Sequence, residues 1–325
     1  MGSNMSNPIA FLDAGRRLQD VATQEQALAA RLSSSGNAFP GSGYRPANRK
    51  TWMAGLGSQN VRLHQVLWPG THNSATNGIG DVLVTRHFSE CQTLSVYEQL
   101  VMGCRVLDVR VENDRRICHG GILGYSVGVV LDDVKRFLGE TSSEIVILEV
   151  RTEFNQQDPP GFDRFLIEQL GDHLIRQDDR VFNKTIAELL PKRVICVSKP
   201  RQSPAPNPGG LLWSAGYLRD NWSNTDLPQT KFDSNLDFLG QNPPLSQRKY
   251  FYRVENTATA QGDNLSSLTV DSVTRRMHRF ARLFISEAHR RGDKLQVFST
   301  DFIDRDFVDA CVGATKGRVD ANRGV

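Results

Sequence analysis

The ten residues EIVILEVRTE, at positions 144–153, join an unbroken apolar run to a charged end. Residues 145–148 are all apolar, so a strand here has two apolar faces, which is typical of a strand covered on both sides in a parallel sheet. Glu149 and Arg151 then share one face, because side chains two positions apart on a strand point the same way. The stretch predicts a buried parallel strand with charge at its carboxyl end.

Strand-like and helix-like segments alternate on both sides of this stretch. Further strand-like segments, rich in apolar and β-branched residues, are 105–112, 193–199, 249–257 and 294–302. Helical periodicity appears in 125–140, in 162–175 and in 272–292, which ends at Gly292. Such alternation favours a parallel α/β sheet. For 325 residues, the leading form is a TIM-type (β/α)8-like barrel, whether regular or distorted.

The first fifty residues have a different character from the rest. Residues 8–32 repeat apolar side chains at helical spacing, and residues 33–50 have the Ser, Gly and Pro content of a linker. We therefore expect an N-terminal segment at 1–50, with a helical extension, and a barrel domain at 51–325. The opening MGSNMS fits the N-myristoylation pattern with Gly2 as acceptor; the alternative is a cloning scar before a native start at Met5.

Composition and cysteine usage indicate a soluble globular protein. The chain is 39% hydrophobic and 23% charged, and its net charge of +3 is too small to indicate a nucleic-acid partner. No apolar run approaches the roughly 18 residues of a membrane helix, and no secretory pattern begins the chain. The five cysteines form no C-x-x-C pair, which favours reduced thiols over a disulfide framework or a zinc site. We expect a monomer in the cytoplasm.

Polar and charged residues gather where the predicted strands end. A packed core does not need charge there, and its burial is costly unless the groups pair or meet a polar ligand. In α/β barrels the carboxyl ends of the strands form the mouth that holds the active site. We therefore expect a polar cleft at that mouth, built from His72, Asn73, Asp108, Arg110, His119, Glu149, Arg151, Lys199, Arg253, Glu255 and Asp301.

This set suits acid–base chemistry on a phosphate ester. Histidine gives and takes protons near neutral pH, and arginine makes bidentate contacts to phosphate. A carboxylate beside a histidine fixes the histidine's tautomer and stabilises its cation. A single histidine after a strand is more commonly structural, so the prediction depends on the whole set. No P-loop, Rossmann glycine pattern or G-x-S-x-G occurs, so nucleotide binding and serine-hydrolase chemistry have no support.

Several motifs together resemble a known family. PGTHNS (69–74), GCRVLDVRV (103–111) and CHGG (118–121) resemble the X-box of phosphatidylinositol-specific phospholipases C. EIVILEVRTEF (144–154), FYRVENT (251–257) and LQVFSTDFIDRDFVDACVG (295–313) resemble the small plant X-box-containing, PLC-like phosphodiesterases. The resemblance extends from Trp52 to Val319 and includes the MGSxxS start.

The resemblance implies a role for each catalytic candidate. His72 matches the general base that activates the inositol 2-hydroxyl for attack on phosphorus, which gives a 1,2-cyclic phosphate. His119 matches the acid that protonates the departing diacylglycerol, and Asp301 matches the carboxylate that orients the base. Arg110 stands where the calcium-dependent enzymes have a ligand, with Asp108 beside it on the strand, so we expect no cofactor. The alternative is a Ca²⁺ site, whose ligands would be Asn73, Asp108 and Glu149.

The expected partner is a phosphoinositide-type lipid at a peripheral membrane surface. Membrane contact would come from an acyl chain on Gly2, from the barrel rim and from exposed aromatics such as Trp213 or Trp222. Two other hypotheses remain open. One is a non-catalytic module that binds phosphoinositides or inositol phosphates, and the other is a metal-dependent barrel phosphodiesterase. The candidates for substrate contact are Asn73, Glu149, Arg151, Lys199 and Arg253.

Overall fold

The chain forms a curled, largely parallel sheet covered by helices. The computed structural model describes residues 8–80, 83–259 and 269–323. Seven parallel strands lie in the order β6-β5-β2-β1-β9-β8-β7. Their bounds are β1 Trp68–Thr71, β2 Val106–Val111, β5 Val146–Thr152, β6 Val194–Lys199, β7 Leu218–Asp220, β8 Phe251–Glu255 and β9 Val297–Thr300. The predicted α/β barrel class is confirmed.

The barrel departs from a regular one in two ways. Strands β3 (Arg116–His119) and β4 (Ile122–Ser126) form an antiparallel ribbon that continues from β2, so His119 ends a hairpin strand. Among the described residues, no strand pairing joins β6 to β7, and the sheet stays open there. The distorted form of the predicted barrel is therefore the one observed.

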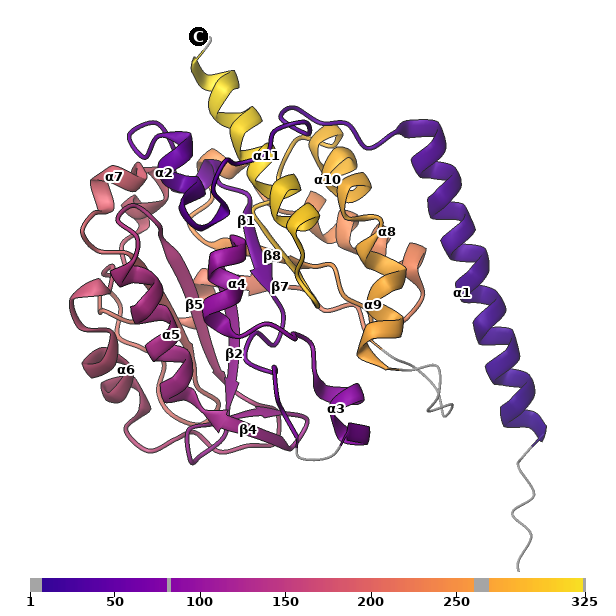
Figure 1. Cartoon of the computed structure of the whole chain (residues 1–325), viewed down its shortest axis with the longest axis horizontal. Coiled ribbons are helices and arrows are strands. Elements are labelled where there is room, and N and C mark those ends of the chain that lie inside the picture. The colour runs from indigo at the N-terminus through magenta and orange to yellow at the C-terminus, as the bar shows by residue number, and fades with distance from the viewer. Residues whose placement is uncertain (1–7, 81–82, 260–268, 324–325) are drawn as a thin grey trace, which may run out of the picture.

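Helices cover the outside of this sheet (Figure 1). Helix α5 (Val127–Gly139) shows why: Val127, Val130, Leu131 and Val134 recur at helical spacing and are all buried. Each such side chain contributes about 1.5–3 kcal/mol when it leaves water. The other helices are α2 (Trp52–Leu56), α3 (Leu83–Ser89), α4 (Val96–Met102), α6 (Phe162–Leu170), α7 (Ile186–Leu189), α8 (Pro228–Gly240), α9 (Val270–His278), α10 (Ala281–Arg290) and α11 (Arg305–Arg323).

The prediction of one long helix at 272–292 was wrong, because two helices, α9 and α10, occupy this region. The amide of Phe280 bonds the carbonyl of Met277 at 3.0 Å, a tighter turn than the α-helical spacing of four residues. The Phe280 side chain is buried at this break. Apolar side chains continue at helical spacing across the break, so the sequence pattern did not reveal it.

Helix α1 (Pro8–Ser35) confirms the helix predicted near the N-terminus, and it lies along the outside of the barrel beside α8 (Figure 1). Arg31 pairs with Asp233 of α8 at 2.7 Å, and Leu28 is fully buried. The proposed lipidation residue Gly2 lies outside the described residues. Within the described part of the chain, no helix is long and apolar enough to cross a membrane.

The segment predicted as a linker packs closely against α11. A Cβ atom on Gly317 would lie 2.2 Å from the carbonyl oxygen of Pro40, and one on Gly41 would lie 1.9 Å from the carbonyl oxygen of Gly313. Only glycine allows two backbones to approach so closely. Residues 39–41 are therefore fixed to the barrel.

Candidate active site

His72 and Asp301 form a buried pair at the carboxyl ends of two neighbouring strands. His72 follows β1 and Asp301 follows β9, whose last residues, Thr71 and Thr300, are paired. The Nδ1 atom of His72 lies 2.8 Å from one Asp301 oxygen, and the other oxygen accepts a hydrogen bond from Thr274 at 3.0 Å. Because the carboxylate attracts the Nδ1 proton, the neutral ring carries its lone pair on Nε2. That is the arrangement a general base requires.

His119 faces His72 across the mouth. The two ring centroids are 6.4 Å apart and the rings are nearly perpendicular, at 86°. The carbonyl of Ser89 accepts a hydrogen bond from His119 Nδ1 at 2.8 Å, which leaves Nε2 to carry a second proton. Burial lowers the pKa of His119; Arg110 and His72 lower it further, and the Ser89 bond opposes the shift.

Arg110 lies near His119 and forms an ion pair with the buried carboxylate of Asp108. It shares a face of β2 with Asp108, whose Oδ2 accepts hydrogen bonds from Arg110 Nη2 at 3.0 Å and from Nε at 3.2 Å. A further guanidinium nitrogen is 3.6 Å from Glu153. Burial alone raises the pKa of Asp108, but Arg110, Arg253 and Arg151 outweigh it and hold that pKa well below its usual value. The pair keeps a fixed cation at the mouth.

The remaining charged candidates form one ion-pair network around Glu149. One Glu149 oxygen lies 2.7 Å from Arg151 and 2.7 Å from Lys199, and the other lies 2.5 Å from Arg253. Burial raises the pKa of Glu149, but these three cations outweigh it and lower the pKa to about 2. Arg253 also pairs with Asp220 at 2.6 Å. The predicted side chains from β5, β6 and β8 therefore meet at one mouth.

The oxygen donors do not fit a calcium ion. Both Glu149 oxygens are held by cations, and Asp108 is bonded to Arg110. Of the three candidate ligands, only Asn73 has a buried oxygen without a hydrogen-bond partner. Ca²⁺ takes six to eight oxygens, so this set, with Arg110 beside it, is too poor in free donors.

Several residues at the site were missed by the sequence reasoning. Thr274 of α9 supports Asp301, and Gln92 donates to the carbonyls of His72 at 3.1 Å and Thr300 at 2.9 Å. Neither residue lies at a strand end, so the pattern of polar and charged residues at strand ends does not indicate them. Their roles become visible only when α9 and the segment after α3 are placed in space.

Two tryptophans were expected at the membrane surface, and the structure separates them. Trp213 is fully buried, so that expectation was wrong: its indole donates to the Ile175 carbonyl at 2.8 Å within the core. Trp222 is 44% exposed and stacks on His72, with ring centroids 5.6 Å apart. The ammonium of Lys231 lies 4.1 Å from the Trp222 ring centroid. Trp222 therefore belongs to the mouth.

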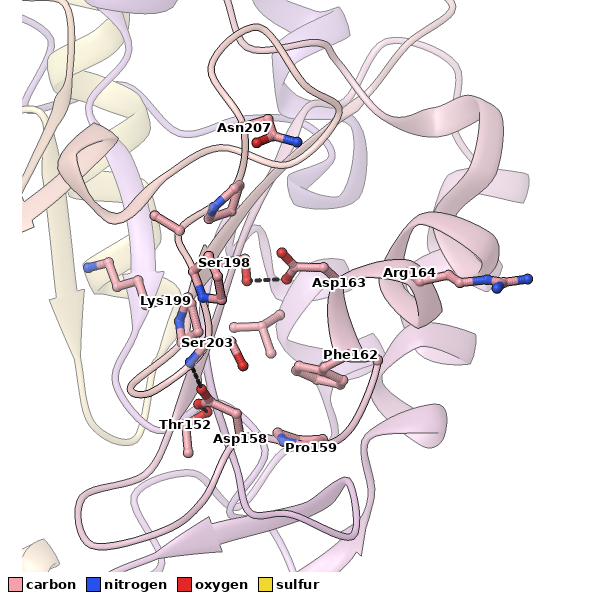
Figure 2. A pocket seen from close by; sticks show the side chains of 16 residues that line it. Thr152, Asp158, Pro159, Phe162, Asp163, Arg164, Ser198, Lys199, Ser203 and Asn207 are labelled. Atoms are coloured by element: carbon pink, nitrogen blue, oxygen red, sulfur yellow. Dashed lines mark hydrogen bonds between the residues drawn. The ribbon is translucent and has the colours of Figure 1, made fainter.

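A separate pocket of about 330 Å³ lies outside the sheet, between β6, the start of α6 and the loop at 200–207 (Figure 2). Its carboxylates are engaged: Asp163 accepts from Ser198 at 2.7 Å, and Asp158 accepts from the Ser203 amide at 2.6 Å. Lys199 borders this pocket, but its ammonium meets Glu149 on the opposite face of the sheet. The pocket shares none of the acid–base residues.

Fold and site define an α/β barrel with two facing histidines, one of them held by an aspartate, beside a fixed arginine. Residues 68–199 match the family profile described as "Phosphatidylinositol-specific phospholipase C, X domain". This region includes His72, Arg110 and His119. This region of the chain is therefore similar to the X domain of phosphatidylinositol-specific phospholipases C, and the resemblance predicted from the sequence is confirmed.

Two curated relatives are similar over part of their length. The 1-phosphatidylinositol phosphodiesterase of Listeria monocytogenes is 33% identical over 111 residues, which cover 34% of this chain and 35% of that protein. A PI-PLC X-box domain-containing protein of Dictyostelium discoideum is 23% identical over 278 residues, covering 74% of this chain and 37% of the relative. The matches therefore span little more than a third of each relative.

Solved structures show the same fold at low sequence identity. The phosphatidylinositol-specific phospholipase C from Listeria monocytogenes superposes with a TM-score of 0.67 at 20% identity, over 82% of this chain and 99% of that one. A Staphylococcus aureus phosphatidylinositol-specific phospholipase C gives a TM-score of 0.60 at 14% identity, over 82% and 97%. These similarities establish the fold; function depends on the site.

Proposed function

We propose that this chain is a phosphodiesterase that cleaves phosphatidylinositol-type phospholipids into diacylglycerol and inositol 1,2-cyclic phosphate. The proposal rests on one observation, the arrangement of acid–base and cationic side chains at the mouth of the barrel. His72, held by Asp301, faces His119 with the ring centroids 6.4 Å apart, and Arg110 lies near His119. The X-domain match and the similarity to the 1-phosphatidylinositol phosphodiesterase of Listeria monocytogenes support the same reaction.

In this mechanism the two histidines transfer protons, and Asp301 and Arg110 stabilise the charges that develop. His72 Nε2 takes the proton of the inositol 2-hydroxyl, and Asp301 stabilises the imidazolium that results. The freed oxygen attacks phosphorus, and the guanidinium of Arg110 stabilises the charge that grows on the phosphoryl oxygens. His119 gives its Nε2 proton to the departing diacylglycerol oxygen while Ser89 holds its Nδ1. No step requires a metal ion.

The ion-pair network supplies the polar groups that bind the head group. Arg151, Lys199 and Arg253 hold Glu149; the partly exposed Arg151 and Lys199 keep further donors for inositol hydroxyls, and the buried Arg253 holds the network together. Because these side chains already brace one another, little rotamer freedom is lost when substrate binds. Asn73 contributes the unpartnered Oδ1 described above.

The lipid substrate places this reaction at a membrane surface. The proposed protein is a cytoplasmic monomer that meets the membrane peripherally. Half-exposed Trp222 at the mouth and a myristoyl chain on Gly2 would assist. One acyl chain gives only marginal, reversible attachment. Binding would therefore be transient.

The proposal is tested by lipid turnover in mixed micelles that contain excess EDTA. Phosphatidylinositol should be cleaved with release of diacylglycerol, and phosphatidylcholine should remain intact, because the only hydroxyl of choline is esterified to the phosphate and none is left for His72 to activate. Binding of phosphatidylinositol without turnover would instead support a non-catalytic module. Turnover that appears only after a divalent cation is added would support a metal-dependent enzyme.

The lowered pKa of His119 predicts activity biased toward acid pH. A general acid must be protonated, so kcat/KM falls as pH rises through its pKa. Because burial lowers this pKa from its ordinary value of 6.5, with Arg110 and His72 adding to the effect, the alkaline limb should lie below pH 6.5. A pH–rate profile of kcat/KM on soluble or micellar substrate measures the limb. A limb well above pH 7 would contradict the role of His119.

A further inference from the structure

Cys91 lies at the catalytic base but has no part in the proposed reaction. It follows α3 and is buried, and its sulfur accepts a hydrogen bond from Asn73 Nδ2 at 3.5 Å. Burial, with Asp301 nearby, raises the pKa of this thiol well above its ordinary value. Cys91 is therefore neither a nucleophile nor a proton donor near neutral pH. Its place beside His72 and Asp301 needs another explanation.

The three side chains present a set of metal donors. A ring nitrogen of His72, the sulfur of Cys91 and a carboxylate oxygen of Asp301 all lie within 4.8 Å of one another. Zinc bonds of about 2.0–2.3 Å place tetrahedral donors roughly 3.5 Å apart, so closing around an ion needs side-chain shifts of about 1 Å. The three residues are far apart in sequence, and no spacing motif marks them.

A fourth donor lies beside this cluster. Asn73 Nδ2 lies 3.3 Å from His72 Nε2 and 3.5 Å from Cys91 Sγ, while the Oδ1 of the same amide is buried without a partner. A half-turn of the amide exchanges these two atoms and brings the oxygen to the sulfur and the imidazole. The cluster then offers one sulfur, one nitrogen and two oxygens.

We propose that His72, Cys91 and Asp301, with Asn73 as fourth donor, form an inhibitory site for a thiophilic divalent cation such as Zn²⁺. A thiolate with an imidazole favours zinc and similar ions, whereas Ca²⁺ and Mg²⁺ prefer oxygen ligands alone. The charges of Cys91 thiolate and Asp301 balance those of the cation. This site shares only Asn73 with the calcium ligand set Asn73, Asp108 and Glu149.

Binding of the cation would switch off the base. The ion takes the lone pair of a His72 nitrogen, the Cys91 thiol loses its proton to solvent, and Asp301 turns from the imidazole to the metal. A metal-bound imidazole cannot accept the proton of the 2-hydroxyl. Inhibition therefore rests on the proposed function of His72, whereas metal binding itself does not.

The first test measures metal binding directly by ultraviolet absorbance, with Cd²⁺ as the probe because its bond to a thiolate absorbs in this range. The full-length wild type, titrated after treatment with chelator, should develop this band at one equivalent. Cys91→Ser should lose the band, while Cys311→Ser, which changes a buried thiol in α11, should keep it. His72→Ala should bind Cd²⁺ much more weakly. No band in the wild type, or a band that survives in Cys91→Ser, would overturn the proposal.

The second test reads inhibition with Zn²⁺ on phosphatidylinositol micelles. Loss of partners that only support metal ligands costs about 10–100-fold in affinity, so loss of the Cys91 ligand should raise the inhibitory Zn²⁺ concentration by at least about 100-fold. Cys91→Ser should keep wild-type turnover in EDTA, and EDTA should restore the inhibited wild type. If Cys91→Ser has a lower melting temperature than the wild type, Cys91→Ala is used in its place. Equal Zn²⁺ sensitivity of wild type and variant would refute the site; if the wild type shows no turnover, the Cd²⁺ titration still decides.

Discussion

Replacing His72 by alanine is expected to lower kcat on phosphatidylinositol by about 10²–10⁴-fold, the usual range for a general base. The 2-hydroxyl then lacks an acceptor for its proton, while Arg110 and His119 remain in place. KM should change little, since His72 accepts the proton in the transition state and contributes little to binding of the ground-state substrate. Steady-state kinetics in mixed micelles with EDTA measures both constants.

His173→Ala is the matched control for this variant. His173 lies before β6, at the end of the barrel opposite the mouth, where its carbonyl accepts a hydrogen bond from the Arg193 amide at 2.8 Å. Its removal should leave kcat near the wild-type value, and circular dichroism should show both variants folded. A His72→Ala protein that is folded and turns over at wild-type rates would exclude His72 as the base.

Replacing Arg110 should produce the second large loss. Removing one fixed donor to a developing oxyanion costs about 10²–10³-fold in kcat, so Arg110→Ala should lose at least that much. The alanine variant also leaves Asp108 buried without its nearest cation, which destabilises the fold by about 3–5 kcal/mol. Activity must therefore be compared at temperatures where thermal melting shows the variant folded.

Arg110→Lys separates catalysis from stability. Lysine keeps a positive charge for Asp108 but cannot hold two phosphoryl oxygens in a planar fork, so the variant should fold and still lose kcat at least tenfold, roughly 1.4 kcal/mol of barrier. Arg136→Ala, which removes an exposed arginine on α5, is the control. Wild-type kcat in Arg110→Lys would mean that a single charge suffices and that the bidentate contact is not used.

The parts of the site that lie on strands were predictable from the sequence. Side-chain alternation places Asp108 with Arg110 and Glu149 with Arg151, and the parallel register then sets Asp108 opposite Glu149. Position at a strand end likewise indicated His72 and Asp301. The structure adds the distances and shows that the cations hold both Glu149 oxygens.

The parts carried by loops and helices were not predictable in the same way. Trp222, Thr274 and Cys91 reach the mouth from a loop, a helix and the segment after α3, and no local pattern marks their direction. The break at Phe280 and the burial of Trp213 depend on packing against distant segments. Tertiary contacts of this kind leave no periodic signal in a single sequence.

Phosphorus NMR tests the proposed acid–base reaction most directly. Phosphatidylinositol in mixed micelles with excess EDTA is incubated with the wild type and, in parallel, with His72→Ala. The resonance of inositol 1,2-cyclic phosphate should appear with the wild type and not with the variant. Direct formation of inositol 1-phosphate with no cyclic intermediate, or a cyclic product that forms only when Ca²⁺ replaces EDTA, would contradict the proposed reaction.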